Sequence, residues 1–266
     1  MKRTILYILL IMLISFTGCK SENEAIPKHG ASMYDDSSVA LSRGTKTLDI
    51  TIDSGNIQIY CWDKKNIKLE TKHNIRDNKT DEDLEELLKN YSIMSKEEDS
   101  TLFFTVDYNG TIKKPQDIYT DIKLTIPKQI KNLKISQQYG NIIIRDKFEG
   151  NIEAELDSVN SDIKSLKGQL LYECDNGNLR LNSAKLLSHS YANINSGNIY
   201  VKAKCQEKSN YSFKTKKGNI DLYFPVDSNI KLNSTGTVNN NQFDGTDGDI
   251  EVETFTKMGK ISVNGY

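Results

Sequence analysis

The chain has 266 residues, and its 35 Lys and Arg residues are balanced by 36 Asp and Glu residues, giving a formal net charge of −1. This balance lacks the basic excess that binding to nucleic acid needs, so we expect no nucleic-acid partner. The four cysteines include no C-x-x-C pair, which argues against a zinc site and against a disulfide framework.

The segment 1–18 has the pattern of a lipoprotein signal peptide. Two basic residues precede an apolar run from Ile5 to Phe16, which is too short to remain as a membrane-spanning helix. The run ends in FTGC, which resembles the lipobox of bacterial lipoproteins, whose cysteine is acylated and becomes the first mature residue. The resemblance implies lipidation of Cys19, with membrane lipid as a partner and palmitate-type chains anchoring the protein on the extracytoplasmic face of the cell membrane. An ordinary secretory signal is the alternative.

Residues 19–44 are polar and show no sustained period of apolar residues. We therefore predict a flexible tether over 19–44 and a folded domain over 45–266. As a random coil, a tether of this length spans about 25–30 Å, which lifts the folded domain clear of the lipid headgroups.

The folded domain begins with short alternating strands and one helix. The stretches LDITID and NIQIY place every second residue on one apolar face, as expected of half-buried strands. In TDEDLEELLKNY, an apolar stripe with helical spacing runs from Leu84 to Tyr91, and Thr80 is placed to cap it. We predict a helix over about 80–91, inserted near the N-terminal end of the domain.

A repeat with a period of about 20 residues, the size of one solenoid coil, occupies the chain after Pro127. Its turn position is held by Gly or Ser, and an apolar residue follows two positions later in every copy. Glycine adopts positive φ without steric cost, and asparagine tolerates it better than most residues, so the recurrent Gly-Asn-Ile predicts a turn followed by a core residue. Asn side chains stacked at this turn can also hydrogen-bond along the column. The turn positions are Gly140, Ser161, Gly177, Gly197, Gly218, Gly236 and Gly259.

The period predicts an all-β fold of the β-solenoid (β-helix-like) type, with coils of about 20 residues. An antiparallel sandwich of hairpins is the competing fold, because Gly-Asn also suits two-residue hairpin turns.

The stretches SGNIQIY, LTIP followed by LKISQQYGNIIIRD, NSGNIYVKAK and KKGNIDLYFP resemble a bacterial β-strand-repeat family of unknown function whose members are named "putative adhesins". The resemblance covers about Thr45 to the C-terminus. It implies a β-helix-like surface module without known catalysis. The chain departs from the family pattern in its acidic helix insert and at residues 237–241.

Few side chains stand out as candidates for a site. We expect no catalytic residues, no metal site and no cofactor, because neither a G-x-S-x-G motif nor His and Cys at ligand spacing occurs. Tyr200 and Tyr223 are candidate ligand-binding residues, since strand parity turns them outward and tyrosine offers a flat apolar face with a hydroxyl.

Together these features predict a non-catalytic, lipid-anchored surface module. Its expected role is that of an adhesin or an envelope-binding or structural protein, with a cell-wall polymer, glycan or surface protein as partner. Two alternatives are an envelope sensor or accessory lipoprotein that partners a membrane protein, and a carbohydrate-active β-helix enzyme.

Overall fold

The computed structural model describes residues 28–243 and 247–266, so the predicted signal peptide, Cys19 and the start of the predicted tether lie outside the described residues. Within these ranges there is one helix, and it is not long and apolar enough to cross a membrane. The elements are β1 (His29–Ala40), β2 (Thr47–Trp62), β3 (Asn66–Asp77), α2 (Asp81–Leu88), β4 (Tyr91–Glu98), β5 (Thr101–Tyr108), β6 (Ile118–Pro127), β7 (Asn132–Glu149), β8 (Asn151–Gly168), β9 (Leu170–Asn176), β10 (Leu179–Leu186), β11 (Tyr191–Ser196), β12 (Ile199–Cys205), β13 (Ser209–Lys217), β14 (Ile220–Phe224), β15 (Ile230–Asn241) and β16 (Ile250–Gly265).

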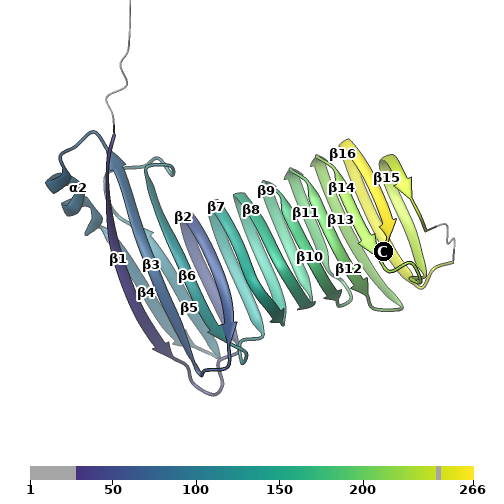
Figure 1. Cartoon of the computed structure of the whole chain (residues 1–266), viewed down its shortest axis with the longest axis horizontal. Coiled ribbons are helices and arrows are strands. Elements are labelled where there is room, and N and C mark those ends of the chain that lie inside the picture. The colour runs from purple at the N-terminus through teal and green to yellow at the C-terminus, as the bar shows by residue number, and fades with distance from the viewer. Residues whose placement is uncertain (1–27, 244–246) are drawn as a thin grey trace, which may run out of the picture.

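The strands form one sheet whose C-terminal part closes on itself (Figure 1). Eight parallel strands pair in the cyclic order β8-β10-β12-β14-β16-β13-β11-β9, and β9 pairs back onto β8. The ring of strands closes because each of two long strands, β8 and β16, pairs with one strand along its first half and with another along its second half. The first half of β8 pairs with β9 and its second half with β10, and β16 joins β13 and β14 in the same way.

The predicted β-solenoid is therefore wrong. In place of an open stack of coils, the described residues contain a closed barrel of eight parallel strands, with further strands added to it. The period of the repeat instead sets how far apart in sequence two paired residues lie: Leu179 pairs with Ile199, and Ile199 pairs with Ile220. The competing sandwich of antiparallel hairpins is not formed either, because all pairings within the barrel are parallel.

All but one of the predicted corners are built on glycine. The six predicted glycines, together with Gly55 at the equivalent position of β2, have φ between 127° and 159°, which favours glycine over other residues. One predicted member is wrong: Gly140 pairs with Val159, so Val159 holds the corner position in β8, and Ser161 lies two residues further along. Ser161 is buried and accepts a hydrogen bond from the Tyr172 hydroxyl at 3.0 Å.

The asparagines that follow the corner glycines form the predicted ladder. The amide group of Asn178 donates to the side-chain oxygen of Asn160 at 2.9 Å, and the amide group of Asn198 donates to Asn178 at 3.0 Å. The same Asn178 oxygen also accepts the backbone N–H of Asn198 at 2.9 Å. The ladder continues when the backbone N–H of Asn219 donates to Asn198 at 2.8 Å. Each side chain thus satisfies polar groups at the corner of the next strand.

The N-terminal strands widen the sheet beyond the barrel. β7 pairs with β8 and with β2, and β2 pairs with β5 and β6. The predicted tether is wrong over residues 29–40, because these form β1, which pairs antiparallel with β3 along its whole length. The predicted helix is present as α2, with Thr80 as its N-cap, and it packs on β1 and β3 through Leu84 and Leu88.

The corner glycines give a direct test of the fold. A Cβ on Gly197 would lie 1.7 Å from the carbonyl oxygen of Gly177 on the paired strand, and φ there is 151°. We expect Gly197→Ala to destabilise the protein by at least about 1–3 kcal/mol in urea unfolding. Gly44→Ala is the control, since its new methyl group would meet only side-chain atoms at 3.8 Å, and we expect a change within about 0.5 kcal/mol. Equal stability of the two variants would contradict the corner geometry.

Candidate functional site

Tyr200 and Tyr223 lie side by side on the outer face of β12 and β14. Their ring centroids are 5.3 Å apart, and the rings are tilted by 41°. Both side chains are half-buried, because they alternate along their strands with buried Ile199, Val201 and Leu222. The structure thus brings together the two tyrosines that the sequence singled out.

Arg180 on β10 extends the pair into a row of three planar groups. Its guanidinium carbon lies 4.3 Å from the centroid of the Tyr200 ring, within the range of a cation–π contact. The Arg180 Nε donates to the Asn182 side-chain oxygen at 2.7 Å, and the Asn182 amide donates to Asp162 at 2.6 Å. This chain of hydrogen bonds fixes the guanidinium over the ring.

The other end of the row is also aromatic and cationic. Lys202 pairs in register with Tyr223, and its Nζ lies 4.0 Å from the centroid of the Tyr266 ring. Tyr266 is 43% exposed. We call Arg180, Tyr200, Tyr223, Lys202 and Tyr266 the aromatic row. It offers ring edges, three hydroxyl groups and two cations on one face, which suits hydrogen bonding and apolar contact with a sugar-like ligand.

Sequence reasoning missed Arg180, Lys202 and Tyr266. The nearly constant sequence offset between paired strands carries the signal for the first two, because it places Arg180 opposite Tyr200 and Lys202 opposite Tyr223. No such signal exists for Tyr266, which follows the last strand and reaches the row only through the barrel pairing of β14 with β16.

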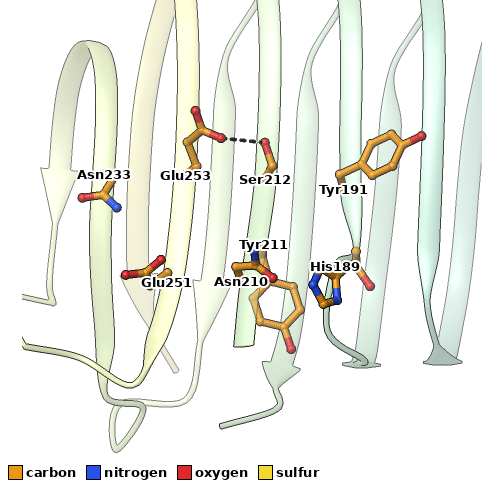
Figure 2. A pocket seen from close by; sticks show the side chains of 9 residues that line it. His189, Tyr191, Asn210, Tyr211, Ser212, Asn233, Glu251 and Glu253 are labelled. Atoms are coloured by element: carbon orange, nitrogen blue, oxygen red, sulfur yellow. Dashed lines mark hydrogen bonds between the residues drawn. The ribbon is translucent and has the colours of Figure 1, made fainter. Parts of the chain in front are cut away.

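A hollow of about 400 Å³ lies on the other side of the barrel, across β11, β13, β16 and β15 (Figure 2). Glu251 and Glu253 line it, together with His189 and Tyr191. Both carboxylates are already paired: Glu251 lies 3.2 Å from the Lys231 Nζ, and Glu253 lies 2.8 Å from the Lys214 Nζ. The hollow is therefore polar but has no unpaired glutamate to act as an acid or base. Within residues 28–243 and 247–266, no group of three or more His, Cys, Asp or Glu side chains could hold a metal ion.

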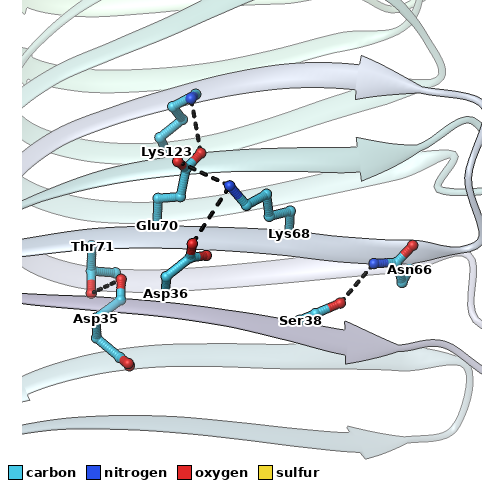
Figure 3. Close-up of polar contacts among 8 residues, drawn as sticks. All are labelled: Asp35, Asp36, Ser38, Asn66, Lys68, Glu70, Thr71 and Lys123. Atoms are coloured by element: carbon cyan, nitrogen blue, oxygen red, sulfur yellow. Dashed lines mark hydrogen bonds and ion pairs between the residues drawn. The ribbon is translucent and has the colours of Figure 1, made fainter.

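A third polar cluster joins β1, β3 and β6 (Figure 3). Glu70 lies 2.8 Å from the Lys123 Nζ and 3.1 Å from the Lys68 Nζ, and Lys68 also approaches Asp36 at 3.6 Å. These two lysines lower the pKa of Glu70, Lys123 having the larger effect. The charges of this cluster therefore pair with one another across three neighbouring strands.

The three cysteines of the described residues are free thiols. Burial raises the pKa of Cys61 to about 11, with a further contribution from Asp146, and burial raises the pKa of Cys205 to about 12. The pKa of Cys174 is also raised, again mainly by burial. The thiolate form is the nucleophile, so all three thiols are poorly reactive in the folded protein.

No protein-family model matches the chain, and no curated protein matches it. Several solved structures do match. A "putative adhesin" from Bacteroides fragilis is 17% identical with a TM-score of 0.49, over 88% of this chain and 97% of that chain. A "putative cell adhesion protein" from Clostridium sporogenes is 12% identical with a TM-score of 0.35, over 88% and 100%. A "putative lipid binding protein" from Parabacteroides distasonis is 15% identical with a TM-score of 0.36, over 88% and 96%. The adhesin descriptions agree with the predicted resemblance, whereas membership of a family is not shown.

The raised thiol pKa values predict slow modification. In the Cys19→Ser chain at pH 8, we expect Cys61 and Cys205 to react with a disulfide reagent at least about 100-fold more slowly when folded than in urea, and Cys174 also to react more slowly when folded. The reaction is followed by absorbance, and mass spectrometry assigns each site. A cysteine that reacts equally fast in both states would contradict its burial.

Proposed function

We propose that the protein is a non-catalytic binding module of the bacterial cell surface, anchored through acylated Cys19, and that it binds a glycan through the aromatic row. The observation that carries this proposal is the placement of Tyr200 against Tyr223 at 5.3 Å, on an outward face flanked by Arg180 and Lys202. The role agrees with the descriptions of the similar solved structures.

The geometry suits a saccharide for two reasons. The hydroxyl groups of the tyrosines supply donors and acceptors, while the ring edges supply apolar surface for the C–H groups of a sugar. Arg180 is held by Asn182 and Asp162, so little side-chain entropy is lost when a ligand arrives. A flat row of this kind supports binding along an extended chain better than enclosure of a small molecule.

The row also stabilises the barrel, because aromatic pairs across neighbouring strands contribute about 0.2–1 kcal/mol. This structural contribution must be separated from ligand binding. Replacement of tyrosine by phenylalanine keeps the two rings in contact and removes only the hydroxyl groups, so it isolates the hydrogen bonds that a ligand would make with the row.

We expect the full chain to bind saturably to at least one member of a glycan array or to purified cell wall. Tyr200→Phe combined with Tyr223→Phe should weaken that binding about tenfold, the loss of two hydrogen bonds of about 0.5–1.5 kcal/mol each. Circular dichroism and the unfolding temperature should stay unchanged.

Tyr34→Phe is the matched control, because Tyr34 is 72% exposed on β1, away from the row, and carries a lysine over its ring in the same manner. Binding that is unaffected by the double variant would remove the aromatic row as the site. Absence of binding to every glycan and wall preparation would oppose the adhesin role and favour a membrane-protein partner.

The anchor has its own test. Cells expressing the protein are grown with a palmitate analogue, and the purified chain is examined for label and for the mass of its N-terminal peptide. We expect the label in the wild-type protein and none in Cys19→Ser. Wild-type protein without label, or label that persists in the variant, would refute acylation at Cys19.

A further inference from the structure

Three lysines stand in line across neighbouring parallel strands at one end of the barrel. Lys185 on β10 pairs in register with Lys167 on β8 and with Lys204 on β12. Neighbouring strands lie about 4.7–4.9 Å apart, and like charges placed directly opposite each other destabilise a sheet. We call these residues the lysine row. The fold alone gives no reason for this arrangement.

The lysine row lacks the acidic partners that other lysines of this protein have. In the part of the chain that the structure describes, many lysines form ion pairs within 4.0 Å, including Lys68, Lys123, Lys134 and Lys214. None of the three lysines of the row forms such a pair there. Glu149 pairs in register with Lys167 at the end of the row, but its carboxylate lies 2.5 Å from the Lys147 Nζ. Glu149 compensates Lys167 in part, so the row keeps a net positive charge, centred on Lys185 and Lys204.

The lysine row borders a concave surface. Its three side chains line a hollow of about 360 Å³ together with Lys147, Ser165, Ser183 and Tyr266. An adjoining hollow of about 480 Å³ shares Lys147 and adds Lys128 and Lys131, but it also contains Asp146 and Glu149, so the excess of positive charge lies in the first hollow. Ammonium and hydroxyl groups are the donors that bind carboxylate, phosphate and sulfate groups. A concave row of donors fits an extended polymer, whereas a flat membrane surface would contact a convex face.

The lysine row is continuous with the aromatic row. Tyr266 lines the hollow and also receives the Lys202 Nζ over its ring, and Lys202 is paired with Tyr223. One ligand chain can therefore contact the tyrosines with its sugar rings and the lysines with its charged groups.

We infer that the ligand is an anionic polysaccharide, whose carboxylate, phosphate or sulfate groups bind Lys167, Lys185 and Lys204. This inference rests on the proposed function and specifies the class of its ligand. The placement of like charges on three strands in succession is then a cost in stability that binding of the polyanion offsets.

The test compares dextran sulfate with neutral dextran of the same length, with the full chain purified in detergent. Binding is measured by calorimetry at 50 and 500 mM salt. We expect dextran sulfate to bind more tightly than dextran and to lose affinity at the higher salt concentration, since exposed charges are screened. Lys185→Glu should weaken the binding of dextran sulfate at least tenfold. Its unfolding temperature should be equal to or above that of the wild type, because the new carboxylate lies between two lysines.

Lys257→Glu is the matched control, since it makes the same charge change on an exposed residue of β16 outside the lysine row. Equal loss of binding in both variants, or no loss in Lys185→Glu, would overturn the inference. Wild-type protein that binds neutral glycans but not dextran sulfate would overturn it while leaving the proposed function intact. Failure of the aromatic row is seen separately, as unchanged glycan binding in the Tyr200→Phe, Tyr223→Phe protein.

Discussion

The close approach of one strand's corner to the next is the constraint on which the rest of the structure depends. At Gly140, Gly197 and Gly259, a Cβ would fall within 1.9 Å of the carbonyl oxygen of the neighbouring glycine. Only glycine allows the backbones to meet at this distance, and positive φ turns the chain there. The asparagine that follows then bonds to its equivalent on the next strand. Each repeat is thereby locked to its neighbour in one register.

This register decides which side chains share a face. Because successive strands pair with a nearly constant offset in sequence, side chains far apart along the chain become neighbours in straight rows. The aromatic row and the lysine row arise in this way, and so does the buried cluster that fills the space behind them. The two rows differ in energetic character. The stacked tyrosines stabilise the sheet, whereas the lysines oppose it, and the second case is the stronger indication of a ligand.

Much of this architecture is readable from the sequence, because glycine, asparagine and the apolar residue after them each have a local physical role. The helix near Thr80 follows from its apolar stripe and capping residue in the same way. Closure of the barrel cannot be predicted in this way, because it depends on β8 and β16 continuing without a break through the corner. In β8 the corner residue is Val159 instead of glycine, so the sequence does not mark the corner there. Strand β1 was not predicted, because its residues are mostly polar. It is held by backbone pairing and by an ion pair to β3.

For the candidate site, strand parity identified Tyr200 and Tyr223 as outward-facing, and the structure adds that their rings meet. Arg180 follows from the offset between β10 and β12, whereas the lysine row needed the exact pairing of β8, which the misplaced corner at Ser161 obscured. A register error of two residues keeps the correct face but moves each residue to the wrong neighbour. The chemistry of a surface built from rows is therefore accessible only after the pairing is known.

The ends of the sheet bear on whether copies of this protein join to one another. β1 and β15 each pair along only one edge within the described residues, so each presents unpaired backbone groups. A free strand edge is a template for the addition of another chain. β15 is interrupted by two register shifts and is rich in Asn, Ser and Thr, while β1 carries adjacent aspartates and a glycine. Bulges and charges of this kind hinder edge-to-edge growth, so the sheet can end in water without templating a fibre.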